Sequence, residues 1–237
     1  MIVPFIIGKT SNGHNQSIDL AETPLLMLSF CNEQQLKIVI QQLCIAGNDY
    51  EHIFYFATNS KRLEQWEINK EDVYVFLKDD PIAGSILSRK KLLDKIITEI
   101  GRRKRILGKK KIASFKRYHE LNLWNEEKLS YNFFVVDDVW DLVVSKPRSL
   151  GLDLITIMLN GPEVGINTII GSEISQHNLL TQLVNLNPKI TTALQEKYGI
   201  PEPKRLGMLG AELTFTTEDF IYFRSANSIE FMRLFGV

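Results

Sequence analysis

Two adjacent carboxylates follow an apolar run in the middle of the chain. The run is "NFFVVD" (132–137), and Asp138 comes directly after Asp137. An acid pair at the end of a buried strand can hold Mg²⁺ through water with its first member and polarise an attacking water with its second. The same position also suits an ordinary cap, in which Asp137 only opens the next element. The pair alone leaves both interpretations open.

A second stretch with the layout of a phosphate site is the turn "FCNEQQLK" (30–37), which lies between an apolar run and a helical pattern. A phosphate loop needs glycines so that backbone N–H groups can converge on the anion, then a lysine, then a Ser/Thr hydroxyl for Mg²⁺. This turn has no glycine, and Glu33 would repel a polyphosphate. Leu36 stands at the position of the lysine, and Lys37 comes one residue later, rotated by about 100° around the helix. The residue types favour an ordinary strand–turn–helix corner.

The third candidate is a basic run of eleven residues, "GRRKRILGKKK" (101–111). Its seven cations are Arg102, Arg103, Lys104, Arg105, Lys109, Lys110 and Lys111. One interpretation is a patch for nucleic-acid phosphates or for an acidic partner. The other is the solvated end of a helix, where cations also interact favourably with the helix dipole. No aromatic residue interleaves with the run, so base stacking is not predicted.

Composition excludes several classes of protein. The chain has 237 residues, with 28 Lys/Arg and 28 Asp/Glu, so its net charge gives no general case for nucleic-acid or membrane binding. The two cysteines form no C-x-x-C pair and the four histidines have no metal-ligand spacing, so we predict a reducing compartment and no metal centre. No apolar run has the length of a membrane helix, and the N-terminus does not resemble a signal peptide. We therefore expect a cytoplasmic protein or fragment without direct membrane insertion. Any membrane association would come through partners or a missing N-terminal region.

The elements that must position these residues follow from hydrophobic patterning. Nearly continuous apolar runs predict buried parallel strands at 25–30, 52–58, 73–77, 132–137 and 167–172. Two more alternating runs, 211–216 and 220–225, predict an antiparallel pair at the edge or end of the sheet. At the N-terminus, "VPFII" and "QSIDL" flank Ser11-Asn12-Gly13 and predict a hairpin.

Helical patterns alternate with these strands. They run from a cap at Asn32 to about residue 46, from Pro81 to about residue 107, and over 112–121, 176–186 and 189–198. Strand–helix alternation predicts a doubly wound α/β sheet. We expect a single domain over 1–237, since no linker or repeat interrupts the pattern.

Five motifs in order resemble the FtsK/SpoIIIE motor family, which includes the EssC-type secretion ATPases. "VPFIIGKTSNGHNQSIDLAETPLLMLSF" is similar to the family's L-P-V-x-x-G strand, hairpin and phosphate-loop strand, and "EIGRRKRILGKKKIASFKRYHELN" (99–122) resembles its E-M-E-R-R-Y helix. "FFVVDDVWDLV" is similar to V-V-V-D-E-F-A-D-L-M. "GPEVGINTIIGSE" (161–173) resembles R-A-A-G-I-H-L-V-L-A-T-Q, and "KRLGMLGAEL" (204–213) resembles L-L-G-x-G-D-M-L.

The resemblance covers nearly the whole chain and implies a fold. This is a P-loop NTPase-like three-layer α/β sandwich of the RecA/ASCE type. It has a mostly parallel central sheet, an N-terminal β-hairpin and C-terminal antiparallel strands.

Roles for the acidic residues follow from the resemblance, residue by residue. Asp137 falls on the Mg²⁺-binding acid, so it would hold Mg²⁺ if a nucleotide binds. Asp138 falls on the catalytic glutamate and is one methylene shorter, and Glu173 falls on the sensing glutamine.

The loop departs from the family pattern at every position that touches phosphate. Phe30, Glu33 and Gln35 stand at the glycines, Leu36 at the lysine and Lys37 at the Mg²⁺-binding hydroxyl. Charge-assisted contacts contribute about 1.5–3 kcal/mol each, so their joint loss would abolish useful affinity. We therefore interpret the loop as a decayed phosphate site that binds no cofactor. Its residues are Asn32, Glu33, Gln34, Gln35, Leu36 and Lys37.

Three functional hypotheses result. The leading one is a catalytically degenerate FtsK/SpoIIIE-like domain that is a non-hydrolysing, structural or partner-binding subunit of a ring or secretion-type assembly. The family implies hexameric rings, in which Arg102 and Arg103 would face a neighbour's nucleotide. The first alternative is an active translocase of DNA or protein that uses ATP and Mg²⁺, with Lys37 and Asp138 as replacements. The second is a nucleic-acid-binding module that uses 101–111.

Overall fold

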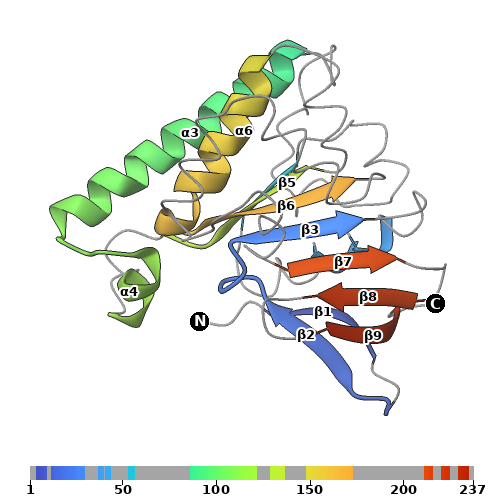
Figure 1. The fold of residues 1–237 in the computed structure, drawn as a ribbon. Helices are drawn as coiled ribbons and strands as arrows, with labels where there is room; N and C mark the ends of the chain where they lie inside the picture. Colours follow the sequence, from blue (N-terminus) through green and yellow to red (C-terminus); the bar gives the residue numbers. More distant parts are fainter. Residues whose placement is uncertain are drawn as a thin grey trace, which may run out of the picture.

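The structure is a computed structural model of the 237-residue chain. It describes residues 4–9, 12–29, 37–39, 41–43, 53–56, 86–121, 129–136, 148–172, 211–215, 220–224 and 229–234. In this part of the chain a twisted sheet runs through the molecule, and two long helices, α3 and α6, lie side by side against it (Figure 1).

The described strands form one nine-stranded sheet in the order β2-β1-β9-β8-β7-β3-β6-β5-β4. The strands are β1 (Pro4–Lys9), β2 (Asn15–Asp19), β3 (Leu25–Ser29), β4 (Ile53–Phe56), β5 (Asn132–Val136), β6 (Ile166–Ser172), β7 (Ala211–Phe215), β8 (Phe220–Arg224) and β9 (Ile229–Leu234). From β4 through β5, β6 and β3 to β7, neighbours are parallel. From β7 onward through β8, β9, β1 and β2, neighbours are antiparallel.

The parallel half confirms the strands predicted from continuous apolar runs at 25–30, 52–58, 132–137 and 167–172. All five residues of β5 are buried, as a strand covered on both faces requires. The strand predicted at 73–77 lies outside the described residues.

The antiparallel half confirms two predictions and corrects one. β1 and β2 form the predicted hairpin, and Gly13 adopts φ +79° in its turn, a conformation that glycine allows at little cost. β7 and β8 pair antiparallel as predicted. Their predicted place at the sheet edge is wrong, because β7 also pairs with β3 and β8 pairs with β9. β9 was not predicted, and it joins the C-terminal strands to the N-terminal hairpin through β1.

Two helices cover the sheet beside β5 and β6. α3 (Ile86–Lys109) confirms the helix predicted from Pro81 onward, although residues before 86 lie outside the described part. It buries Leu92, Leu93, Ile96, Ile100 and Leu107 at helical spacing. α6 (Arg148–Asn160) packs beside α3, where Lys90 Nζ lies 2.8 Å from Asp153 Oδ2. α6 was not predicted.

Shorter helices complete the described part. α4 (Phe115–Glu120) lies within the predicted 112–121, and the hydroxyl of its cap, Ser114, accepts a hydrogen bond from the Arg117 N–H at 3.3 Å. A 3₁₀ turn, η2 (Pro162–Val164), precedes β6. Residues 37–39 and 41–43 are helical, as predicted, whereas the Asn32 cap and the helices predicted at 176–186 and 189–198 lie outside the described residues. Within the described helices, none is both long and apolar enough to span a bilayer.

Candidate functional site

The carboxyl edge of the parallel sheet is the first candidate region. β6 lies between β3 and β5 and is parallel to both, with Ser29 beside Ser172 and Ile170 beside Val136. Ligands in open α/β sheets bind outside the carboxyl ends of such strands. In sequence, the loop, the acid pair and Glu173 follow directly on β3, β5 and β6.

Most of the predicted site residues at this edge lie outside the described residues. They are Asn32, Glu33, Gln34, Gln35, Leu36, Asp137, Asp138 and Glu173. Lys37 is among the described residues. It is helical and half-buried, and Val39, two residues later in the same helix, is buried. The structure therefore places the strands that lead to this site, and the roles of the residues remain predictions.

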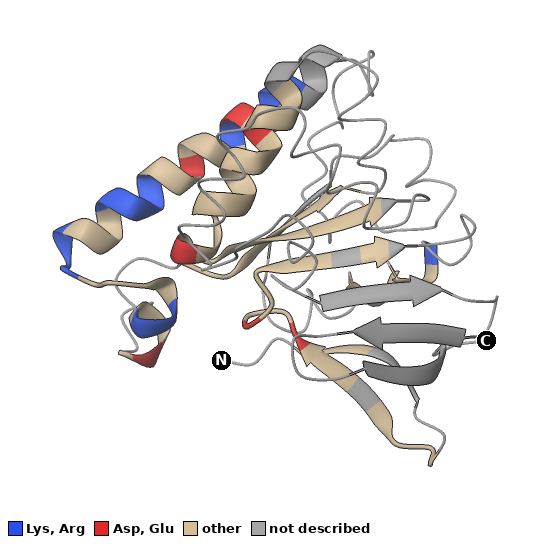
Figure 2. Ribbon diagram, in the orientation of Figure 1, with Lys and Arg blue, Asp and Glu red and all other residues tan. Residues whose placement is uncertain are grey.

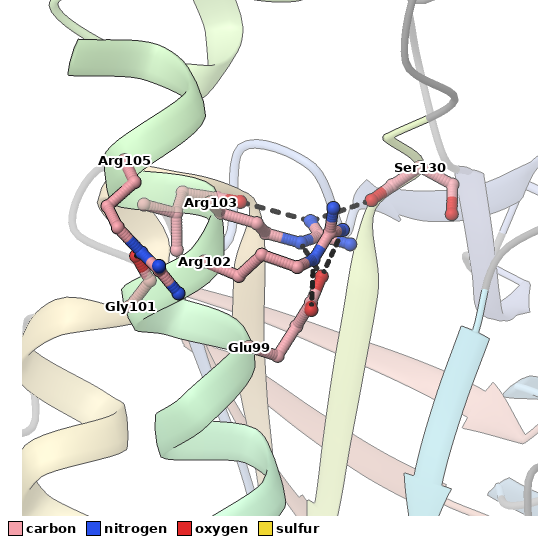
Figure 3. Close-up of polar contacts among 7 residues, drawn as sticks. Glu99, Gly101, Arg102, Arg103, Arg105 and Ser130 are labelled. Carbon is pink, nitrogen blue, oxygen red and sulfur yellow. Dashed lines mark hydrogen bonds and ion pairs between the residues drawn. The ribbon is translucent and has the colours of Figure 1, made fainter. Parts of the chain in front are cut away.

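The opposite, amino edge of the sheet holds a buried arginine. The Arg103 side chain is only 2% exposed and comes from the last third of α3. Its Nε lies 2.7 Å from Glu99 Oε1, and one terminal nitrogen donates to the carbonyl oxygens of Ser130 at 2.9 Å and Val164 at 3.0 Å (Figure 3). These carbonyls belong to the segments that lead into β5 and β6, so one guanidinium ties α3 to the start of two central strands.

Glu99 completes this ion pair. Its carboxylate also accepts two hydrogen bonds from the guanidinium of Arg102, at 2.7 and 2.8 Å. Burial opposes ionisation of Glu99, but the hydrogen bonds and charges of Arg102 and Arg103 outweigh it and lower the pKa of Glu99. The Glu99 carboxylate is therefore ionised at neutral pH, with Arg102 and Arg103 as its partners.

The assignment of Arg103 to a binding surface needs correction. Its guanidinium lies inside the fold, 5.3 Å from the ring centroid of Phe115, and cannot meet a partner's phosphate from there. Glu99, one helical turn earlier, is the sequence signal for this role, since charges four residues apart face each other on a helix.

The other cations of the basic run divide into paired and unpaired groups. Lys104 Nζ lies 2.7 Å from Asn160 Oδ1 and 3.3 Å from Glu163 Oε2, so it is bound to the end of α6 and to η2. Arg105 is exposed and, among the described residues, donates to the Gly101 carbonyl alone, at 3.3 Å. Lys109 and Lys111 are exposed, and neither forms an ion pair within the described part of the chain. Lys110 is half-buried.

Lys111 lies two residues after the last residue of α3 and has a left-handed backbone conformation. It has φ +54°, its N–H donates to the Gly108 carbonyl, and the Ile112 N–H donates to the Leu107 carbonyl at 2.9 Å. These two bonds define a Schellman motif, whose left-handed position is usually glycine. A lysine there costs about 1–2 kcal/mol relative to glycine.

The basic run and the carboxyl ends of β3, β5 and β6 lie at opposite edges of the sheet. The run ends beside the segments that enter β5 and β6, whereas the corner follows the carboxyl ends of the strands. Five strand residues separate these edges by roughly 17 Å. Within one chain, Arg103 and Lys104 therefore lie at the edge opposite to the carboxyl ends of β3, β5 and β6.

An aromatic cluster behind Arg103 was missed by the sequence analysis. Phe115 contacts Tyr131 edge to face, with ring centroids 4.9 Å apart. His119 stacks on Tyr131, with ring centroids 5.2 Å apart. Burial chiefly lowers the pKa of His119, aided by the positive charges of the N-terminus and Arg103. Burial chiefly raises the pKa of Tyr131 to about 12, aided by nearby carboxylates.

Two further residues explain why the segment around β6 has its sequence. Gly165 adopts φ +75°, and a Cβ there would lie 2.1 Å from Phe115 Cδ1. Asn167 is buried and donates to the Leu20 carbonyl at 2.6 Å, which anchors the end of the N-terminal hairpin on β6. The sequence shows Gly165 as the glycine of the A-A-G-I-H-like motif, but it does not show why a glycine is needed there.

The described residues contain no group of three or more His, Cys, Asp or Glu that could hold a metal ion.

Comparison with known proteins gives one similar sequence and several similar folds. No protein-family model matches the chain. The DNA translocase FtsK of Treponema pallidum is 22% identical over 240 residues, which cover 96% of this chain and 29% of that protein. The sequence is thus FtsK-like over almost its full length, as the motifs indicated.

The similar solved structures include a conjugation coupling protein and a secretion ATPase. The pCW3 conjugation coupling protein TcpA, a monomer form with ATPγS, matches with a TM-score of 0.69 at 15% identity, over 99% of this chain and 66% of that one. The cytoplasmic domain of the Thermomonospora curvata type VII secretion ATPase EccC matches with a TM-score of 0.62 at 14% identity, over 98% of this chain and 28% of that one. The chain spans less than two thirds of each relative. The similarity confirms the predicted P-loop ATPase-type α/β fold.

Proposed function

We propose that this FtsK-like domain has lost its phosphate chemistry and is a non-hydrolysing, partner-binding subunit of a translocation or secretion-type assembly. One observation carries the proposal. The parallel strands of the fold are in place, with β3, β6 and β5 side by side, while the eight residues that follow β3 are "FCNEQQLK". The scaffold suits a nucleotide motor, and the loop chemistry does not.

The energetic argument concerns the free energy with which the loop would bind a triphosphate. Without glycines, the loop has lost the residues that allow close backbone approach, and without the lysine it has no cation at the expected position. Glu33 adds a repulsive charge. Asp137 and Asp138 supply carboxylates, but acids bind Mg²⁺ in such sites together with the substrate's phosphates. Loss of the loop therefore disables the acid pair and Glu173 as well.

The proposed partners are protein subunits. The similar proteins are a DNA translocase, a conjugation coupling protein and a secretion ATPase, by their names, and this chain corresponds to one part of each. A domain of this fold without turnover can still occupy a place in a ring or stack beside active neighbours. We propose that role for this chain, with homo- or hetero-oligomeric contacts.

Nucleotide titration tests the proposal. Isothermal titration with ATPγS and Mg²⁺, together with a phosphate-release assay with ATP, should show neither binding at millimolar nucleotide nor turnover. Micromolar binding that is removed by both Lys37→Ala and Asp137→Asn, but not by Lys116→Ala on α4, would overturn it. The chain would then be an active ATPase in which Lys37 replaces the usual lysine.

A further inference from the structure

The exposed side of α3 concentrates positive charge in an otherwise neutral chain. α3 contains nine Lys/Arg and two Asp/Glu, whereas the whole chain contains 28 of each kind. Figure 2 shows basic residues along much of α3, on the outside of the molecule. Such asymmetry attracts polyanions through the local field, whatever the net charge.

Five of these cations form a single row. Their spacing of four, seven, three and four residues is the repeat of one helix face, and Thr98 falls on the same face in the seven-residue gap. All five are exposed, while the buried side chains of α3 occupy other positions of the repeat. We call this row the α3 stripe. It consists of Lys91, Lys95, Arg102, Arg105 and Lys109, and it is about 27 Å long at 1.5 Å per residue.

Charge on the stripe is only partly neutralised within the described part of the chain. Arg102 forms an ion pair with Glu99, but Lys91, Arg105 and Lys109 form no ion pair with the described residues. The two acids of the helix are already occupied: Asp94 lies 2.6 Å from Lys90, and Glu99 is held by two arginines. Figure 3 shows Arg105 pointing away from the Glu99–Arg103 pair.

The residue types on the stripe favour a phosphate backbone over a protein surface. Protein interfaces centre on aromatic and apolar anchors and are depleted in lysine. The stripe has no such anchor, and the large apolar side chains exposed in the described part are Leu121 and Leu152, neither of which is on α3. A duplex presents one phosphate charge per about 1.7 Å of axis, so about sixteen charges span the stripe. Cations alone suffice for such contacts, without base reading.

We propose that the α3 stripe binds the phosphate backbone of nucleic acid, independently of base sequence and of any nucleotide. The stripe differs from the basic run 101–111: it excludes Arg103, which is buried, and Lys104, which is bound to α6 and η2, and it includes Lys91 and Lys95. It lies on the exposed side of α3 and contains no residue of the loop or of the acid pair. The proposal therefore does not depend on the proposed loss of ATP binding.

A charge-matched pair of variants tests the stripe. The stripe variant is Lys91→Gln, Lys95→Gln, Arg105→Gln and Lys109→Gln, and it leaves Arg102 to hold Glu99. The control variant is Lys90→Gln, Lys104→Gln, Lys116→Gln and Arg117→Gln. It removes the same charge from the half-buried Lys90 and from three exposed positions on α3 and α4. Circular dichroism and thermal unfolding establish that each variant is folded.

Binding is measured without nucleotide by fluorescence anisotropy, on two unrelated duplexes of about 30 base pairs, between about 50 and 200 mM salt. We expect equal affinity for both sequences, at least a tenfold loss in the stripe variant, and a smaller loss in the control. The slope of log K against log salt should fall in magnitude by about 3–4 in the stripe variant.

Three outcomes would overturn the proposal. The first is no duplex binding at the lowest salt, and the second is an equal loss in the stripe and control variants. The third is stripe-dependent binding of polyglutamate or of phosphatidylserine vesicles without binding of DNA, which would assign the stripe to an acidic protein or a membrane surface. The nucleotide titration is read separately, so failure of one proposal leaves the other unaffected.

Discussion

The two edges of the parallel sheet both resemble a motor domain, but for different reasons. At the amino edge, the residues that match the E-M-E-R-R-Y and A-A-G-I-H motifs are explained by packing: Arg103 joins α3 to β5 and β6, and Gly165 makes room for Phe115. At the carboxyl edge, the motif positions would carry the chemistry, and Leu36 and Glu33 are the wrong types for it. If the proposed loss of nucleotide binding is correct, the chain keeps the scaffold residues of the FtsK-like motifs without the reaction, so function must be argued from the site.

Removal of Arg103 is the strongest test of the amino edge. Arg103→Ala leaves Glu99 without one partner and the Ser130 and Val164 carbonyls without a donor, inside the fold. Breaking a buried ion pair from one side costs about 3–5 kcal/mol, and we expect a loss of that size in the free energy of unfolding. Urea denaturation followed by circular dichroism measures it.

Arg102→Ala is the matched control, because Arg102 bonds to the same carboxylate from an exposed position. Exposed pairs contribute about 0.2–1 kcal/mol, so this variant should be close to the wild type. If the two variants lose similar amounts of unfolding free energy, burial does not explain the contribution of Arg103 to stability.

Gly165→Ala tests the other scaffold residue at this edge. The added methyl group would meet the Phe115 ring, and φ +75° disfavours any residue with a Cβ. Overpacking and backbone strain together should destabilise the protein by about 2–4 kcal/mol. Gly108→Ala is the contrasting change, since a Cβ there has open space in α3 and should stabilise by about 0.5–1 kcal/mol. Thermal unfolding distinguishes the two, and the same sign in both would contradict the explanation.

Restoring the family-type residues of the loop tests whether the loop alone prevents nucleotide binding at the carboxyl edge. The variant carries Phe30→Gly, Glu33→Gly, Gln35→Gly, Leu36→Lys and Lys37→Thr. If only loop chemistry is missing, this chain should bind ATPγS with Mg²⁺ at least tenfold more tightly than the wild type, about 1.4 kcal/mol. Isothermal titration measures it, with Asp137→Asn added to the rebuilt loop as the control that should lower affinity again. A folded rebuilt chain that binds no nucleotide would show that the scaffold itself no longer fits a triphosphate.

The sequence predicted the parallel half of the fold well because buried parallel strands leave a local signal. Runs such as "NFFVVD" are apolar on both faces, and no other element of that length needs this pattern. α6 was missed because six of the nine residues of "LDLITIMLN" are apolar and three are β-branched, so period alone does not separate a buried helix from a strand. β9 was missed because its role depends on pairing with β1, more than 220 residues away in sequence.

The sequence shows a group of cations but not which of them are exposed. The seven cations in 101–111 left two interpretations open, a binding patch and the solvated end of a helix, because charge does not reveal which side chain faces the core. Arg103 and Arg102 are adjacent in sequence, yet one is buried and the other exposed, because successive residues on a helix differ by about 100°. The α3 stripe follows only once the buried face of the helix is known.

The smallest expected effect concerns pH at the amino edge. The pKa of His119 is lowered in the folded protein, so on acidification the unfolded chain takes up the proton first. Its contribution to stability is present above pH 6.5 and is lost as pH falls toward and through the folded-state pKa. Arg103 adds positive charge near the ring, and the rings of Tyr118 and Tyr131 pack against it. His119→Phe keeps a ring in the cluster and removes the titration, so urea unfolding between pH 5 and 8 should depend less on pH than in the wild type. Equal pH dependence in the two proteins would place the acid sensitivity elsewhere and leave the cluster with a packing role alone.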